Sequence, residues 1–381
     1  MKKAMKLAAL ISAAAMMSGM LLPLPVSMEI PAAITASAED DEEYTEGSIS
    51  SLYYAKYSDH VAITGFESDK STFEIPETIE GLPVTCIDTG AFASSKLTGI
   101  TIPKTVTTIK EWAFSTCLDL KSITLPDSVD YIGAQAFDLC TSLNNVELPD
   151  HFVRIENEAF TGTPWIERLR SQDPMVIVNG ILLDGTTLTG AVELPSTVKY
   201  IAAGAFYKND KLTSVVIPAA VKEVPDSTFF MCENLTSVEM EGVEVIGSTA
   251  FAYCDKLTDV KINGKAKTIE PLAFMDSTGT ATITVYGTEA DWKSVDIQDE
   301  SEFLTKAKYV FDPSHTVPED KPVIGDVNGD GAFSVLDVVA FQKWLAVVPG
   351  ATLKDAQAGD LDKNGVLDIF DLALMKHALH R

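Results

Sequence analysis

The sequence predicts a solenoid of stacked coils with short parallel strands, followed by a small all-α module, so the fold class is α+β. Two marks recur along most of the chain with one period of about 23 residues: Ala-Phe, and an apolar residue followed by proline. Two acidic segments with a shared spacing near the C-terminus indicate the helical module. A fixed period in the twenties is typical of coils that bury one continuous core only when they are stacked.

The Ala-Phe mark sets the register of the coils. Its phenylalanines are separated by 22 or 23 residues, apart from one step of 46, which is two steps of 23. They are Phe92, Phe114, Phe137, Phe160, Phe206, Phe251 and Phe274, with Thr228-Phe229 as the one variant. The proline mark keeps the same period, so we expect every coil to contain one strand, one turn and one corner filled by Ala-Phe.

Residues 118–140 show what one coil contains. Leu120, Ile123 and Leu125 are apolar and stand among polar neighbours, which indicates a short strand with one buried face. Pro126 lacks an N–H group and therefore ends the strand. We expect the strands of successive coils to pair in parallel, about 4.8 Å apart.

This spacing resembles the leucine-rich repeats of the bacterial surface-antigen (BspA) type, whose coil reads roughly LxxIxIPxxVxxIxxxAFxxCxxL. The resemblance covers residues 72–285. It implies a scaffold that presents a surface, since repeat folds carry no single chemistry.

One coil, at residues 161–195, is irregular because it lacks the expected Ala-Phe. Residues 175–183 read as a hairpin around an Asn-Gly turn. Two interpretations stay open: an insertion that carries binding specificity, or a packing irregularity anchored by Trp165.

The two ends of the solenoid need covering, since a bare end would expose unpaired strand edges. We expect an N-terminal cap at residues 39–71 that contains a hairpin, and a C-terminal cap at residues 286–311. Residues 312–322 contain two prolines and mixed charge, which indicates a linker.

The segment 1–38 has the pattern of an export signal peptide. Three lysines precede a long apolar run, and Ala36-Ser37-Ala38 is a small-residue cleavage site. A membrane anchor is the alternative, but two prolines break the run and an acidic segment follows it. We therefore expect a secreted, extracellular protein whose mature chain does not insert into a membrane.

Residues 323–381 contain two loops of one pattern, which begin at Asp326 and Asp360. Each places oxygen atoms at positions 1, 3, 5, 7, 9 and 12 around a glycine at position 6, which is the arrangement that binds calcium. The ligands expected in the first loop are Asp326, Asn328, Asp330, Ala332 through its carbonyl, Ser334 through water, and Asp337. Those expected in the second loop are Asp360, Asp362, Asn364, Val366 through its carbonyl, Asp368 and Asp371. The sequence thus predicts two Ca²⁺ ions and folding that depends on them.

Each loop is followed by an expected helix, at residues 336–346 and 370–379, and neither is preceded by one. With aspartate at position 12 of both loops, these duplicated units resemble a type I dockerin over residues 323–381. The resemblance implies attachment to a cell-surface or cellulosome scaffold, with a cohesin module of that scaffold as partner, in one orientation or two. It places cohesin contacts at Val335, Leu336, Lys343, Ile369, Phe370 and Lys376. Core packing is the alternative for the four apolar residues among them.

Charge and the motifs that are missing from the sequence exclude several classes of function. The net charge of −26 argues against binding to nucleic acids or anionic lipids, and we expect neither as a partner. The chain has no nucleophile elbow, HExxH motif or phosphate-binding glycine loop, so we expect no enzyme activity. Polar, mostly non-aromatic outward positions on the strands favour an unknown protein ligand. The alternatives are a carbohydrate-binding or polysaccharide-degradation component, and a protease inhibitor or regulator.

Four of the five cysteines share one register. Cys117, Cys140, Cys232 and Cys254 each lie three residues after a repeat phenylalanine, which predicts a buried column of thiols. Cys86 lies on another register. Neighbouring coils could bring two thiols close enough for a disulfide, but the period explains the column without one.

Overall fold

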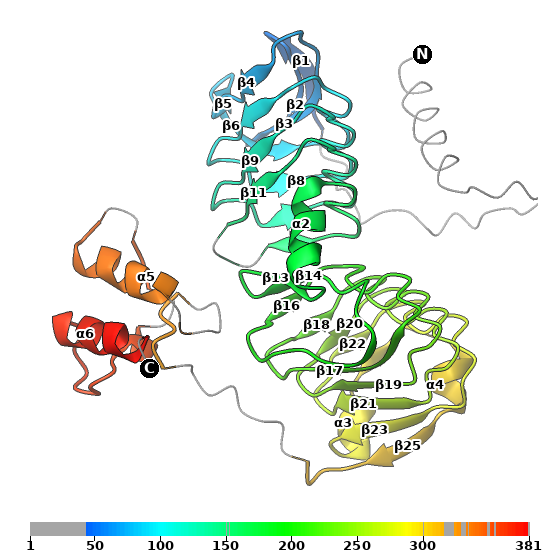
Figure 1. The fold of residues 1–381 in the computed structure, drawn as a ribbon. Helices are drawn as coiled ribbons and strands as arrows, with labels where there is room; N and C mark the ends of the chain where they lie inside the picture. Colours follow the sequence, from blue (N-terminus) through cyan, green and yellow to red (C-terminus); the bar gives the residue numbers. More distant parts are fainter. Residues whose placement is uncertain are drawn as a thin grey trace, which may run out of the picture. The chain divides into compact units, whose positions relative to one another are not determined.

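The computed structural model describes residues 43–149, 151, 153–299, 301–315, 324–328, 333, 335–348, 351–353 and 356–379. The expected export signal, residues 1–38, lies outside them. The stacked coils form two rows of strands, which confirms the predicted fold class of a solenoid with few helices (Figure 1).

The first row, here the long-strand row, contains the strand that precedes the proline mark in each coil. Its members are β4 (Thr72–Glu74), β7 (Gly99–Thr101), β9 (Ser122–Thr124), β11 (Asn145–Glu147), β15 (Gly190–Glu193), β17 (Leu212–Ile217), β19 (Ser237–Met240), β21 (Asp259–Asn263), β23 (Thr282–Tyr286) and β25 (Lys308–Phe311). The pairs β4–β7 and β9–β11 and the run from β15 to β25 are parallel ladders, as predicted.

The second row contains the strand that precedes each Ala-Phe corner. Its members are β6 (Leu82–Ile87), β8 (Thr108–Ile109), β10 (Tyr131–Ile132), β12 (Arg154–Ile155), β14 (Ile181–Asp184), β16 (Tyr200–Ile201), β18 (Glu223–Val224), β20 (Val245–Ile246), β22 (Thr268–Ile269) and β24 (Asp296–Ile297). These strands also pair in parallel, in separate ladders before and after the irregular coil.

An antiparallel meander covers the N-terminal end of the solenoid. β1 (Thr45–Ile49) pairs with β2 (Leu52–Lys56), and β2 pairs with β3 (Val61–Phe66), so the expected hairpin is present. β3 continues in parallel into β6, and the short β5 (Thr78–Ile79) pairs antiparallel with β6. The meander thereby occupies the edge that the first coil would otherwise expose.

The repeat phenylalanines form a stack through the core. The ring of Phe137 lies between those of Phe114 and Phe160, with centroids 5.1 and 5.2 Å away and ring planes within 3°. A second stack runs from Phe206 to Phe274. Because each ring packs on the next, the coils share one apolar column in each half of the solenoid.

A helix that we did not predict lies in the irregular coil. α2 (Pro164–Gln172) begins after Thr163, whose hydroxyl accepts the Ile166 N–H, and has proline at its first position. Trp165 packs its edge on Phe160, at 4.9 Å between centroids, and so closes the first stack. Trp165 is thus the anchor that one of the two interpretations expected.

The predicted hairpin follows this helix. β13 (Val176–Val178) and β14 pair antiparallel, and Asn179 and Gly180 both have positive φ, as a type I′ turn requires. Gly185 then donates its N–H to the Ala205 carbonyl. In other coils the repeat phenylalanine donates the equivalent hydrogen bond to the next coil. The ring of Phe206 fills the space beside Gly185, where a Cβ would lie 2.5 Å from it.

The column of thiols is present, and all five cysteines are buried and free of disulfides. Each thiol of the column donates to the carbonyl of the repeat phenylalanine one coil earlier, at 3.1 to 3.2 Å. Ser277 makes the same bond in the last coil, at 2.7 Å. Each of the four carbonyls that accept a thiol also accepts a backbone N–H from its own coil, so the weak S–H donor bonds its second lone pair.

We expect these thiols to be unreactive in the folded chain. The four thiols of the column are almost completely buried, so a reagent cannot reach them in the folded chain. Burial also raises the pKa of Cys232 to about 12 and raises that of Cys254 well above its usual value. The hydrogen bonds of Cys117 with Cys140 and Ser95 lower the pKa of Cys117 to about 7, so burial alone protects that thiol. Iodoacetamide without reductant should modify none of the cysteines in native protein and all five in urea, measured by intact mass. Fewer than five additions in urea would indicate a disulfide.

The C-terminal end of the solenoid is covered by two short helices. α3 (Glu289–Trp292) begins after Thr288, whose side chain accepts the Asp291 N–H, and lies in the expected C-terminal cap. α4 (Glu302–Lys306) was not predicted, and its Phe303 stacks on Phe274 at 4.8 Å, in place of the next coil. β25 pairs with β23 and is the last strand of the long-strand row.

The module that follows contains the two predicted helices. α5 (Val335–Leu345) and α6 (Ile369–Ala378) each follow a loop. The 3₁₀ turn η1 (Gln357–Gly359) precedes the second loop, where we expected no helix. Val327, Val338, Phe341, Leu372 and Met375 form the buried core of this module.

Candidate metal centre

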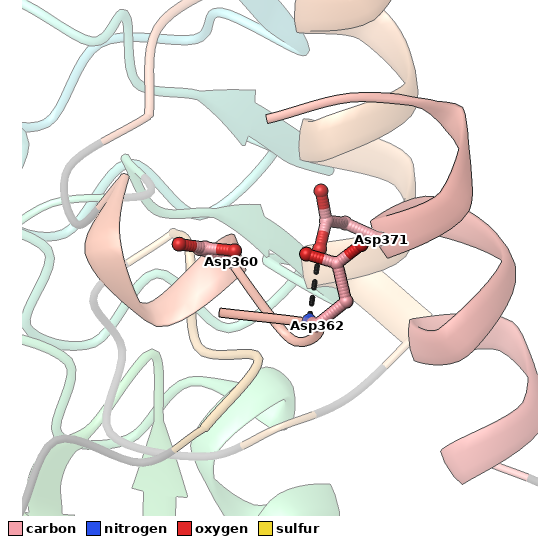
Figure 2. A group of neighbouring side chains, drawn as sticks. All are labelled: Asp360, Asp362 and Asp371. Atoms are coloured by element: carbon pink, nitrogen blue, oxygen red, sulfur yellow. Dashed lines mark hydrogen bonds between the residues drawn. The ribbon is translucent and has the colours of Figure 1, made fainter. Parts of the chain in front are cut away.

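The second predicted loop brings three carboxylates together. Asp360, Asp362 and Asp371 each offer one oxygen, and these atoms all lie within 4.8 Å of one another (Figure 2). Asp371 comes from the first turn of α6, and the other two come from the loop before it. Among the residues that the structure describes, no other group of three His, Cys, Asp or Glu side chains meets this criterion.

Backbone amides hold the loop around these carboxylates. Oδ1 of Asp371, a fully buried side chain, accepts the N–H groups of Leu361 and Asp362 at 2.9 and 3.2 Å. Asp360 accepts the N–H groups of Asn364 and Gly365, at 3.1 and 2.9 Å. Gly365 has φ +80°, which explains a glycine at position 6 of the loop.

The donor set fits a hard divalent cation. Three carboxylates so close together repel one another, and a cation that binds oxygen removes this repulsion. The amide bonds leave other oxygen lone pairs available, since each carboxylate has about four acceptor sites. The residues present therefore suit calcium.

Three expected ligands of the second loop lie outside this cluster. Asp368 caps α6, since its Oδ1 accepts the Phe370 N–H at 2.7 Å. Oδ1 of Asn364 accepts the Val366 N–H, and its Nδ2 donates to the carboxylate of Asp362. Asn364, Val366 and Asp368 remain predicted ligands.

The first loop repeats one key contact. Asp337 is fully buried at the start of α5, and its Oδ1 accepts the Asn328 N–H at 3.1 Å. The Asp371–Asp362 contact of the second loop joins the same two loop positions, 12 and 3. Asp326 belongs to the same segment as Asn328, whereas Asp330, Ala332 and Ser334 lie outside the described residues.

The predicted cohesin positions lie on the surface of the module. Val335, Ile369 and Phe370 are 63%, 68% and 67% exposed, so the alternative of core packing is wrong for them. Lys343 and Lys376 are exposed, and the side chain of Leu336 lies outside the described part of the chain. Large exposed apolar side chains such as these are typical of surfaces that bind a partner.

The outward side of the long-strand row is mostly polar, as predicted. Glu147 accepts a bond from Thr124 at 2.9 Å, and Lys261 pairs with Glu239 at 2.8 Å. Sequence reasoning missed Tyr286 and His315, which stack on each other at the C-terminal end of this side. His315 belongs to the expected linker, and no repeat or motif around it indicates this contact.

Along the part of the chain that the structure describes, no helix combines the length and the apolar character that crossing a bilayer requires.

These features define the chain as a solenoid of leucine-rich coils with a C-terminal module of two loop–helix units. Residues 67–189 and 185–281 match the BspA type leucine rich repeat region, in six copies. The chain belongs to this BspA-type leucine-rich repeat family. Residues 324–380 match the dockerin type I domain, a class of domain that generally binds calcium.

Solved structures with similarity are bacterial leucine-rich proteins. A leucine rich cell surface protein from Faecalibacterium prausnitzii is 20% identical, covering 68% of this chain and 99% of that one, with a TM-score of 0.33. The T. pallidum leucine rich repeat protein is 26% identical, covering 56% and 91%, with a TM-score of 0.32. The comparison with curated proteins found no match.

Proposed function

We propose that this chain is a secreted, non-catalytic adaptor that binds a cohesin of a cellulosome-type scaffold through its dockerin and presents its repeat region to a protein ligand. The observation that carries the proposal is the arrangement at α6. The carboxylates of Asp360, Asp362 and Asp371 converge beside the exposed apolar pair Ile369 and Phe370. A metal that orders this loop would also fix the patch that meets the partner.

The proposed metal content is two calcium ions, one in each loop. The Asp337–Asn328 contact in the first loop matches the Asp371–Asp362 contact in the second, which supports two sites of one kind. The residues that would hold the ions are the twelve predicted loop positions. A bound ion supplies the positive charge that these side chains need to lie together.

The proposed cohesin surface contains Val335, Leu336 and Lys343 on α5, and Ile369, Phe370 and Lys376 on α6. The duplication gives both halves a related surface. Val335 and Ile369 occupy the same position of their loops, two residues before the final aspartate, and are similarly exposed. Exposed apolar residues and lysines on the same two helices suit a partner of mixed apolar and acidic character.

For the repeat region we favour a protein ligand over a carbohydrate. Its long-strand row presents threonine, serine and charged side chains, and sugar binding commonly uses exposed aromatic rings. Tyr286, the aromatic ring found there, has one face covered by His315. A role in polysaccharide degradation through the scaffold remains the second candidate, because of the dockerin.

Calcium titration and cohesin binding test the proposal. The mature chain should bind two calcium ions by isothermal titration calorimetry, and should bind at least one member of a cohesin panel only with calcium present. A double variant with Ile369→Asp and Phe370→Asp should bind calcium but lose the cohesin. Cohesin binding that survives EGTA, or no binding across the panel, would contradict the proposal.

A further inference from the structure

The first residues after the last strand fold back onto the long-strand row. The ring of His315 stacks on that of Tyr286, with centroids 3.5 Å apart and planes within 9°. Nε2 of His315 is buried, has no hydrogen-bond partner, and lies 3.4 Å from Oε1 of Glu241. A buried polar atom aimed at a carboxylate without a bond indicates a contact that depends on charge.

A tight turn holds His315 in this position. Oδ1 of Asp312 accepts the N–H groups of Ser314 and His315, at 3.0 and 3.2 Å, and the Ser314 hydroxyl at 2.6 Å. β25 ends just before this turn, at Phe311. The expected linker therefore begins with an ordered segment, residues 312–315.

The groups around the imidazole carry excess negative charge. Glu239, near the end of β19, accepts bonds from the Tyr286 hydroxyl at 2.6 Å and from Lys261 at 2.8 Å. Burial favours the neutral acid, but the bonds from Lys261 and Tyr286 outweigh it and lower the pKa of Glu239. Glu239, Glu241, Asp259 and Asp312 thus face one cation, Lys261, which Glu239 already engages.

We propose that the protonated form of His315 fastens the first residues of the linker to the solenoid, and that loss of this proton releases them. The imidazolium gains attraction from Glu241 and from the face of Tyr286, whereas a neutral ring leaves Nε2 buried without a bond. The contact is closed while the imidazole carries its second proton and open once the ring is neutral.

Release would change the distance that the C-terminal module can reach. Freeing residues 312–315 lengthens the linker by up to about 13 Å of extended chain. A shorter linker lowers the conformational freedom of two modules joined by it. The proposal rests on the solenoid and its linker alone, so it stands whether or not the module binds a cohesin.

Hydrogen exchange with mass spectrometry tests the switch on the mature chain. Protection factors, which correct for the intrinsic effect of pH, are compared at pH 5.5 and pH 8.0 for peptides that cover residues 308–315. We expect protection after β25 to fall about tenfold at the higher pH, the scale of one partly buried ion pair together with a cation–π contact. Peptides from β21 should stay equally protected at both pH values.

Three variants separate charge from packing. His315→Gln should have low protection at both pH values, and His315→Arg, a permanent planar cation, should be protected at both. Glu241→Gln should reduce protection at pH 5.5. His60→Gln, at a histidine of the N-terminal meander, is the control and should behave as the wild type. Equal protection of the wild type at both pH values, or a pH effect that persists in His315→Gln, would overturn the proposal.

Discussion

Asp371→Asn is expected to weaken calcium binding at the second loop on the order of 100-fold or more, because it removes the charge of a ligand at position 12. Asn keeps one oxygen with nearly the same shape, so the N–H groups of Leu361 and Asp362 retain their acceptor, but its amide nitrogen cannot accept the Asp368 N–H that Oδ2 of Asp371 accepts at 3.0 Å. The loss reports mainly the charge of the site, because one helix-capping bond contributes only about 1 kcal/mol and a 100-fold change in affinity corresponds to about 2.8 kcal/mol. Isothermal titration calorimetry with calcium measures it.

The same substitution should have the opposite effect without calcium. In EGTA, the variant has one fewer carboxylate repelling Asp360 and Asp362, so its C-terminal module should be at least as ordered as that of the wild type. With calcium present, the module of the wild type should be more ordered than that of the variant. Hydrogen exchange over residues 356–379 follows both states, and Asp119→Asn, at an exposed solenoid residue, is the matched control. If the same one of the two proteins is better protected both with calcium and in EGTA, the cluster does not bind calcium.

Periodicity predicted the regular coils because one physical constraint recurs in each of them. Every coil must bury an apolar strand position and one ring, so Ile123 and Phe137 are both buried where their spacing placed them. The acidic loops also follow a fixed spacing, because the calcium predicted for them requires oxygen at fixed positions. Asp371 and Asp337 accordingly hold matching positions in the structure.

The sequence was less informative wherever the period fails. α2 could have been found from Thr163 and Pro164, an N-cap followed by proline at the first helical position, but its apolar residues follow no coil register. Phe303 extends the aromatic stack from a helix beyond the last Ala-Phe mark, out of step with the period, so no repeat pattern indicates it. Residue 185 is a glycine because the ring of Phe206 fills the space where a side chain would lie, and only the fold reveals this contact.

Phe137→Ala is expected to destabilise the solenoid by about 3–5 kcal/mol. The ring is fully buried between Phe114 and Phe160, and its neighbours are fixed by the coils above and below, so the cavity has little freedom to collapse. Urea unfolding followed by circular dichroism measures the loss. Leu118→Ala removes an apolar side chain that is mostly exposed in the same coil, and should cost less than about 0.5 kcal/mol.

The coils that lose stability in Phe137→Ala are as informative as the size of the loss. The aromatic stack is interrupted between Trp165, which closes the first part, and Phe206, which begins the second. Two separate clusters of buried residues follow the same division. Because coils in a solenoid are stabilised by their nearest neighbours, the cavity at Phe137 should increase hydrogen exchange in β8, β10 and β12 more than in β18, β20 and β22. An equal increase in both sets would show that the irregular coil transmits stability as a regular coil does.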